Sequence, residues 1–284
     1  MKNEFLPSRY VEIIQRLALG IEPIDSQRAR RLEYPLQVQH EAAVFGLPRP
    51  PIERHTSNLY ALRYQPGITA PLKLRFFDSA IPPYRPESDR RRIVARRLTI
   101  PVFKIADVET LEKNEADAAN TPVKDFKRRI RRPVFFPGAA YDFSSMTTGL
   151  RGRVMRNGLP MRWARVVATL TGSGVIVGRA HGDDRGEFLL LINAHLTSAG
   201  PVPNILDIRV TVFGPRDAPT PTPADLPDLD PLWDLPLETL ANPGEDDPVA
   251  TGDQLPWTDT KNVTRVVRFI FGKCLSGEPD FVIT

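Results

Sequence analysis

The chain lacks several features that mark common classes of protein. It has 284 residues but a single cysteine, Cys274, which excludes an internal disulfide framework and fits synthesis in a reducing compartment. No stretch approaches the ~20 apolar residues of a membrane span. The amino-terminal segment carries charges at Glu4, Arg9 and Glu12, where a signal peptide needs an unbroken apolar run. We therefore expect cytoplasmic synthesis and no ordinary export.

Motifs for catalysis are missing as well. Neither Ser144-Ser145 nor Ser173 lies in a G-x-S-x-G frame. The glycines around Ser173 lack the lysine and the following helix of a phosphate loop. We predict a protein without catalytic residues and without a cofactor.

Proline is the abundant residue instead. The 29 prolines are about twice the usual share of roughly 5%, and they are densest over residues 215–260. Such a density disfavours long helices and favours short strands joined by extended loops. The apolar share of 41% and the charged share of 25% are typical of a soluble globular protein. The expected fold class is mainly β, with two antiparallel β-domains.

Residues 149–192 have the clearest periodicity. Alternate residues from Leu150 to Val154 are apolar or small, and Asn157-Gly158 then supplies the positive φ angles of a tight hairpin. A second hairpin turn is predicted at residues 183–186. The pattern predicts an antiparallel sandwich over residues 146–214. Its predicted core residues share one strand parity: Val154, Ala164, Val166, Ala168, Leu170, Phe188, Leu190 and Ile192.

Trp163, Leu189 and Leu191 have the opposite parity and are expected off the core face of the sandwich. Large apolar side chains in that position need another cover. We expect that cover to be a partner subunit, the first domain or the acidic segment described below.

These residues resemble a known family. The elements Gly152-x-Val154, Asn157-Gly158-x-Pro160, Ala164-x-Val166 and Asp184-x-Gly186-Glu187-Phe188 are similar to the carboxypeptidase regulatory-like domain, a transthyretin-like sandwich. The resemblance implies an accessory or adhesive module without catalytic residues of its own. The zinc peptidase that gives the family its name would need a histidine with a glutamate three positions later, and none of the four histidines has one.

The residues before the sandwich predict another β-domain over 32–145, after a lead-in over 1–31. Helical spacing in residues 8–19 predicts a short amphipathic helix. Apolar alternation predicts four or more strands around Leu36, Leu59, Leu72 and Leu98, separated by proline-bearing loops. A polar insertion over 106–125 is expected to form an exposed helix or lid.

Residues 215–261 form a distinct acidic segment, which we call the arm. Between residues 215 and 260 it has eleven acidic residues and one basic residue, a net charge of −10. Because the whole chain carries +4, the rest carries +14 and should attract the arm. Proline density predicts an extended path without regular ladders, held by Leu229, Leu232, Trp233, Leu235, Leu237 and Trp257.

The last segment, 262–284, begins with a strand. Val263, Val267 and Phe269 alternate with other residues over 263–271, which predicts a strand added to a sheet of the same chain or of a neighbour. The predicted interface residues are therefore Trp163, Leu189, Leu191, Leu232, Trp233, Trp257, Val263, Val267 and Phe269.

Two sites of charged residues have competing interpretations. His181, Asp183 and Asp184, with His195, could hold a metal ion, but aspartates are ordinary turn residues and we favour the turn. Basic clusters at 90–97 and 127–132 could neutralise phosphates. Because no aromatic residues are interleaved with them, we favour a solvated or arm-binding face over nucleic acid.

These features together predict a non-catalytic structural or assembly protein whose partners are protein subunits. The run Arg91 to Val102, in tandem with the sandwich, resembles accessory proteins of phage tails and extracellular contractile injection systems. The resemblance implies a subunit that becomes part of a released particle. The alternative is a module that binds carbohydrate or peptide at the sandwich, for which Trp163 is the best support.

Overall fold

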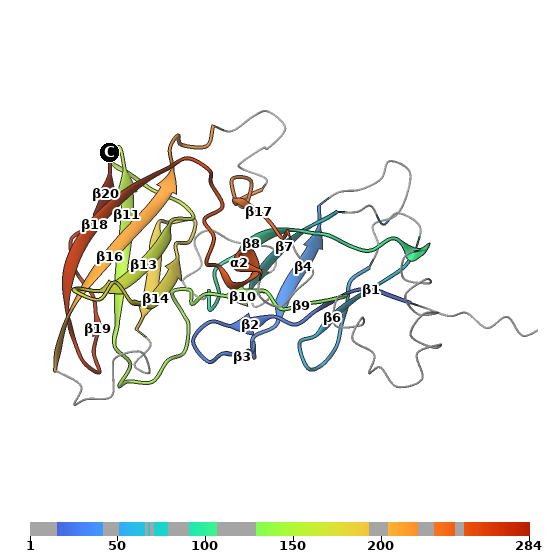
Figure 1. The fold of residues 1–284 in the computed structure, drawn as a ribbon, viewed down its shortest axis with the longest axis horizontal. Coiled ribbons are helices and arrows are strands. Elements are labelled where there is room, and N and C mark those ends of the chain that lie inside the picture. Colours follow the sequence, from blue (N-terminus) through green and yellow to red (C-terminus); the bar gives the residue numbers. More distant parts are fainter. Residues whose placement is uncertain are drawn as a thin grey trace, which may run out of the picture.

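The computed structural model describes residues 16–41, 51–65, 68, 71–78, 91–106, 129–192, 204–220, 230–241 and 247–284. The chain is mainly β, as predicted. Two groups of strands lie side by side along the long axis, with the arm between them (Figure 1). We call residues 16–138 the N-terminal unit, and residues 149–215 together with 260–283 the C-terminal unit.

The described residues of the N-terminal unit form three sheets with β17 of the arm, and strands form around all four predicted positions. The first has the order β5 (Glu53–Arg54), β6 (Tyr60–Arg63), β1 (Leu17–Ile21) and β9 (Ile130–Arg131). The second has the order β10 (Val134–Phe135), β2 (Ile24–Asp25) and β3 (Arg30–Arg31). The third has the order β17 (Leu237–Thr239), β8 (Arg96–Ile100), β7 (Leu72–Asp78) and β4 (Leu36–His40).

Two predictions for this unit are wrong in part. Residues 8–15 lie outside the described residues, but Leu17 to Leu19 belong to strand β1 and not to a helix. Residues 18–21 are all buried, and Ala18, Leu19 and Ile21 pack in the core of this unit. A short run that is apolar on both sides fits helical and extended spacing alike. The unit is also not wholly antiparallel, since β1–β9, β2–β10 and β8–β17 are parallel pairs. Of the predicted insertion, only Ala106 is described.

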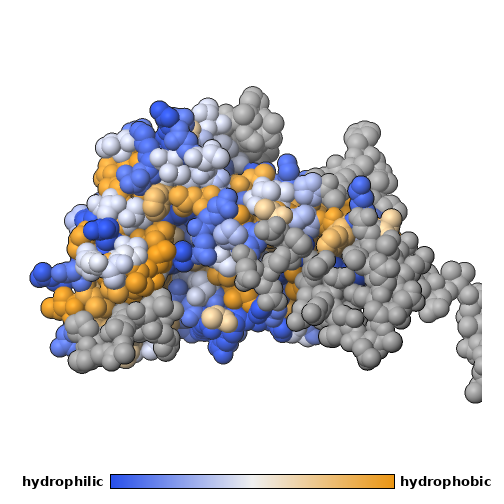
Figure 2. All heavy atoms as spheres, in the orientation of Figure 1, coloured by the Kyte–Doolittle hydropathy of each residue, from blue (hydrophilic) through white to orange (hydrophobic). Residues whose placement is uncertain are grey.

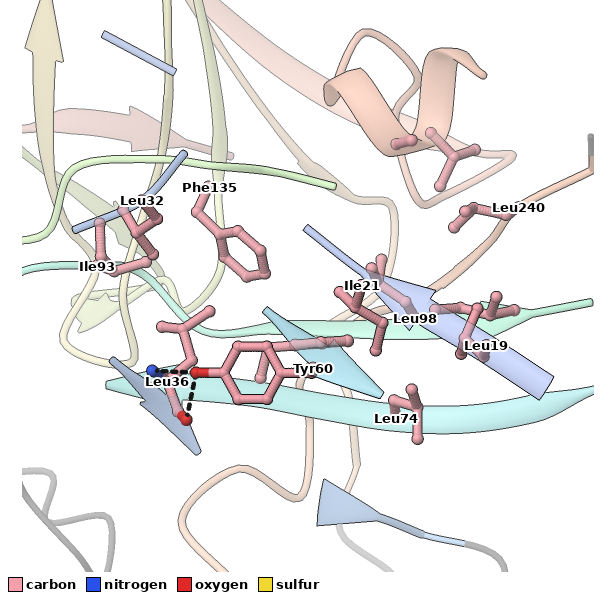
Figure 3. Packing of buried hydrophobic residues seen from close by; sticks show 14 of the residues in the cluster. Leu19, Ile21, Leu32, Leu36, Tyr60, Leu74, Ile93, Leu98, Phe135 and Leu240 are labelled. Atoms are coloured by element: carbon pink, nitrogen blue, oxygen red, sulfur yellow. Dashed lines mark hydrogen bonds between the residues drawn. The ribbon is translucent and has the colours of Figure 1, made fainter. Parts of the chain in front are cut away.

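The core of the N-terminal unit is shared with other parts of the chain (Figure 3). Its centre is formed by leucine, isoleucine and aromatic side chains of the first and third sheets, and the Tyr60 hydroxyl both accepts from the Leu36 N–H and donates to its carbonyl, at 2.8 Å each. The same cluster includes side chains from the C-terminal unit and the arm: Leu189, Leu191, Leu240, Val249 and Ala250.

In the C-terminal unit, the strands that the structure describes form two sheets in a sandwich-like arrangement. One contains β12 (Leu159–Pro160), β11 (Gly149–Arg156) and β15 (Glu187–Leu191), with β19 (Cys274–Leu275) and β20 (Phe281–Ile283) also paired to β11. The other has the order β14 (Ile176–His181), β13 (Arg165–Leu170), β16 (Ile205–Pro215) and β18 (Thr260–Ile270). One apolar cluster contains side chains from both sheets.

The predicted parity of this unit is confirmed. Val154, Val166, Phe188 and Leu190 are buried in its core cluster, while Leu189 and Leu191 belong to the core of the N-terminal unit. Gly152 is required beneath Phe188, because a Cβ atom there would lie 2.4 Å from the ring.

The two predicted turns have different outcomes. Asn157 and Gly158 have φ angles of 51° and 78° between the paired Arg156 and Leu159, as a two-residue hairpin requires. The turn at 183–186 is not a hairpin within one sheet. It carries the chain from β14, which pairs with β13, to β15, which pairs with β11.

The carboxyl-terminal residues complete the C-terminal unit. Strand β18 pairs with β16 over eleven residues, from Ile205↔Ile270 to Pro215↔Thr260. Strands β19 and β20 pair in parallel with the opposite sheet. The chain therefore leaves this unit after β16, crosses the N-terminal unit as the arm and returns at β18. The predicted added strand is confirmed, and it is added within the same chain.

Candidate functional site

The arm docks on the N-terminal unit through a short ladder. Leu237, Glu238 and Thr239 of β17 pair in parallel with Arg97, Leu98 and Thr99 of β8. This ladder corrects the prediction that proline excludes regular pairing in the arm. Residues 237–242 contain no proline, so this interval can supply the N–H groups that a ladder needs.

A buried ion cluster joins the arm to both units. The Glu238 carboxylate accepts from Arg96 of β8 at 2.7 Å and from Arg165 of β13 at 3.0 Å. Arg96 also donates to the carbonyl oxygens of Val134, Val249 and Ala250. We call the contact of Arg96, Glu238 and Arg165 the junction, because its three side chains come from the N-terminal unit, the arm and the C-terminal unit.

The junction is charged although water is excluded from it. The side chains of Arg96, Arg165 and Glu238 are at most 4% exposed. Burial alone would raise the pKa of Glu238, but the charges and hydrogen bonds of Arg96 and Arg165 lower it, so the carboxylate is ionised. Burial lowers the pKa of Arg165 to about 10. Removal of the single carboxylate would leave two buried positive charges together.

His181 lies beside the junction as a buried neutral base. It pairs with Arg165 across the β13–β14 ladder, and its ring stacks on Phe136 with 3.8 Å between centroids. Neither ring nitrogen has a hydrogen-bond partner among the described residues. Burial first, and then the charges of Arg165 and Arg96, lower the pKa of His181 well below its usual value. A proton on this ring would add a further positive charge beside one carboxylate.

Trp163 lies at a second contact between the units and the arm. Its indole N–H donates to Asp234 of the arm at 2.8 Å, and Arg162 donates to the same carboxylate oxygen at 2.7 Å. The ring is 1% exposed. It packs in a cluster made of residues from the arm and the N-terminal unit: Phe77, Val94, Ala95, Leu232 and Leu235.

Most of the predicted interface residues lie at contacts within the chain. Trp163 and Leu232 are in the cluster just described, and Leu189 and Leu191 pack in the core of the N-terminal unit. Val263, Val267 and Phe269 face the core of the C-terminal unit. Trp233 is half-buried in the arm, and half-buried Trp257 lies against the Arg165 guanidinium, 5.8 Å from the ring centroid. For Trp163, Leu189 and Leu191, the cover is the arm and the N-terminal unit of the same chain.

Asp183 and Asp184 bind arginine in the structure. Buried Arg91 of the N-terminal unit contacts both carboxylates, and Asp183 also accepts from the backbone N–H groups of Arg185 and Glu187. The turn interpretation is consistent with these bonds. His195 lies outside the described residues, and within those described no group of three metal-ligating side chains is close enough to hold an ion.

Some residues of the basic clusters bind the arm. Arg96 binds Glu238, and Arg97 donates to the Leu235 carbonyl and to Glu41. Arg91, Arg96 and Arg131 are buried, so they do not present charge to a phosphate backbone. These contacts agree with the predicted arm-binding face. Arg90, Lys127 and Arg128 lie outside the described residues.

The outer edge of β18 is open. Within the described part of the chain, β16 is the one strand that pairs with β18. The ladder ends with bonds from Phe271 N–H to the Asn204 carbonyl and from Arg216 N–H to the Asp259 carbonyl. Since pairing alternates along an antiparallel ladder, odd-numbered residues bond to β16 and even-numbered residues from 262 to 268 turn their N–H and C=O groups outward.

Apolar side chains are exposed next to this edge. Val266 and Ile205 are each 53% exposed, and Ile270 is 39% exposed. Figure 2 shows apolar atoms gathered where β16 begins and β18 ends, at the lower left of the C-terminal unit. The surface combines unpaired strand backbone with apolar side chains, the properties of a strand that accepts another strand.

Comparison with known proteins adds no relative. No family model, curated protein or solved structure matches the chain. Among the described residues, no helix is long and apolar enough to cross a membrane.

Sequence reasoning missed the most buried parts of the arm. Leu240, Val249 and Ala250 enter the core of the N-terminal unit, and α2 (Pro248–Thr251) is capped by the buried Asp247 carboxylate. The signal for α2 was present, since an aspartate followed by proline and, four residues later, glycine is typical of a short capped helix. Glu238 had no signal that separated it from the other acidic residues of the arm.

Proposed function

We propose that this chain is a non-catalytic structural or assembly subunit that contacts neighbouring subunits through the open edge of β18. The observation that carries the proposal is the eleven-residue strand β18, which pairs on one side with β16 and on the other side with no described strand. Exposed edges attract other strands, and proteins that do not use them usually shorten or cover them. A long uncovered edge with exposed Val266 and Ile270 is suited to subunit contact.

The remainder of the molecule supports a mechanical role. The arm links both units through the junction, and Leu189 and Leu191 of the C-terminal unit enter the core of the N-terminal unit. Domains with such shared cores move as one body, unlike domains joined by a small polar contact. A rigid body of this kind transmits position from one neighbour to another.

The finer fold and the setting come from sequence resemblance. We assign the C-terminal unit to the transthyretin-like sandwiches of the carboxypeptidase regulatory-like type, with β18 to β20 as additions to that stretch. We place the subunit in a phage tail-like or contractile injection particle, made in the cytoplasm and released with the particle. The resemblance of residues 91–102 to accessory proteins of such particles supports this setting.

The rival function loses its main support. A carbohydrate- or peptide-binding module needs an accessible aromatic platform, and Trp163 is 1% exposed beneath the arm. Subunit contact is therefore the function that the geometry supports best.

Sedimentation tests the proposal. The tagged chain would be expressed at its own locus, and the lysate would be fractionated by size beside a strain that lacks the neighbouring genes. We expect the chain in a fast-sedimenting particle that is lost in the deletion strain. A chain that stays monomeric in both strains, and binds glycans or peptides as a monomer, would support the rival function.

A further inference from the structure

Strand β18 has a marked charge asymmetry. Residues 260–275 contain Lys261, Arg265, Arg268 and Lys273 and no acidic residue. On the adjacent strand, Arg209 is exposed, while Asp207 is already paired with Arg268. The open edge is therefore positively charged along its length.

The basic side chains lie on both sides of the edge. Lys261 and Arg265 extend toward β20, where Lys261 donates to the Thr284 carbonyl and Arg265 donates to the Pro279 carbonyl and covers the Phe281 ring. Arg268 lies on the exposed outer face with Val266 and Ile270. A strand added here would meet positive charge on one of its faces and both apolar and positive groups on the other.

This arrangement disfavours a second copy of the same edge. Antiparallel pairing of β18 with β18 of another chain would bring two sets of basic side chains together without a counter-charge, and opposed like charges destabilise a ladder. Basic residues on an edge are a known protection against pairing of identical chains. The same residues attract a strand of opposite charge.

We propose that the open edge of β18 accepts an extended acidic strand of a different protein, in which carboxylates alternate with β-branched apolar residues. On the face toward β20 the carboxylates meet Lys261 and Arg265, and on the outer face the apolar side chains cover Val266 and Ile270. Backbone bonds form to the outward N–H and C=O groups of Asn262, Thr264, Val266 and Arg268. This inference rests on the proposed function, because it names the chemistry of the partner at the same surface.

The test uses the full chain and labelled peptides of about nine residues, which span most of β18. The acidic probe alternates Glu with Val and Thr. A basic probe has Lys in place of each Glu, and a third probe is the acidic one with N-methyl groups on alternate residues, which removes the donors of one edge. Binding is measured by fluorescence anisotropy, with and without about 0.5 M salt to screen charge.

We expect the acidic probe to bind, the basic probe not to bind, and N-methylation to weaken binding by about tenfold or more. Val266→Pro removes an outward N–H that has no partner in the sheet, and should weaken the acidic probe similarly. Lys261→Glu, at an exposed position of β18, should weaken it, whereas Lys73→Glu, an exposed strand position in the N-terminal unit, should not. The N-methyl probe needs no change in the protein and so is independent of how variants fold.

Three results would overturn the inference. Equal binding of the acidic and N-methylated probes would mean attraction to charge without strand addition. Absence of binding would exclude an acidic strand. A dimer by light scattering that Val266→Pro abolishes would make a second copy the occupant.

The proposed function is judged separately by sedimentation. If the chain sediments with a particle and Val266→Pro does so equally, the subunit role stands and the edge assignment fails. If the wild-type chain does not sediment but binds the acidic probe, the edge assignment stands and the subunit role fails.

Discussion

Arginine side chains lie both at the junction and along the edge of β18, but in opposite surroundings. At the junction, Arg96 and Arg165 are buried, share the Glu238 carboxylate and also donate to backbone carbonyls. At the edge, Arg268 is largely exposed and has one long contact to Asp207. Buried ions depend on their partners because water cannot replace them, whereas exposed ions do not. The junction is therefore a completed contact within the chain, whereas the edge of β18 is available for contact with another chain.

The largest expected effect is at the junction. Glu238→Gln removes the one carboxylate between two buried arginines, and we expect a loss of about 3–5 kcal/mol in the free energy of unfolding. Urea unfolding followed by tryptophan fluorescence measures it, because all three tryptophans lie in the arm or against it. As a control, Asp259→Asn breaks the exposed pair with Arg216 and should leave stability unchanged. Equal effects of the two changes would show that the junction is not the stronger contact.

Two neighbouring leucines test whether the units unfold together. Leu189 packs in the core of the N-terminal unit and Leu190 in that of the C-terminal unit. We expect Leu189→Ala and Leu190→Ala each to cost about 2–5 kcal/mol, the usual range for a buried leucine. Both should lower one shared transition in calorimetry. Two separate transitions, each shifted by one variant alone, would mean that the units are independent.

Acid should weaken the junction because it protonates His181 on unfolding. The folded-state pKa of His181 is depressed, whereas the unfolded chain takes up its proton near pH 6.5. The free energy of unfolding is therefore unaffected by His181 above that pH. It falls as the pH drops below it, by about 1 kcal/mol between pH 7 and 5.5. His181→Gln should remove this part of the slope in a series of urea titrations. His55→Gln, at an exposed position, should keep it.

The smallest expected effect is on the exposed face of β18. Val266→Thr replaces an exposed side chain with another β-branched residue, so the change in stability should stay within about 0.5 kcal/mol. Val267→Thr, the matched change on the buried face of the same strand, puts a hydroxyl into the core and should cost about 1–3 kcal/mol. If the two costs were equal, Val266 would already be covered.

Strand parity was predictable from the sequence because it depends on neighbouring residues. Alternation placed Leu190 in one core and required a separate cover for Leu189. The nature of that cover was not predictable, because it depends on pairing between distant parts of the chain. The helix expected over residues 8–19 failed at β1 for the same reason: Leu17 to Ile21 are extended because β6 and β9 lie on either side of them.

The arm shows which contacts can be predicted from net charge alone. The net charge of −10 against +14 predicted attraction, and Arg75, Arg96 and Arg162 do meet acidic groups of the arm. Net charge does not distinguish one acidic residue from another, and it led us to expect exposed ion pairs. Glu238 is different because β17 pairs with β8 at its position and thereby places its carboxylate between two arginines. Only the three-dimensional pairing separates this residue from the others.

Amide hydrogen exchange of the wild-type chain, resolved by residue, tests the contrast between the two contacts most directly. Strand amides that are paired and buried exchange slowly, and unpaired edge amides exchange fast. We predict slow exchange for the β17 ladder with β8, and an alternating pattern on β18. In that pattern Val263, Arg265, Val267 and Phe269 are protected, while Asn262, Thr264, Val266 and Arg268 exchange quickly. Uniform protection along β18, or fast exchange throughout β17, would contradict a closed junction and an open edge.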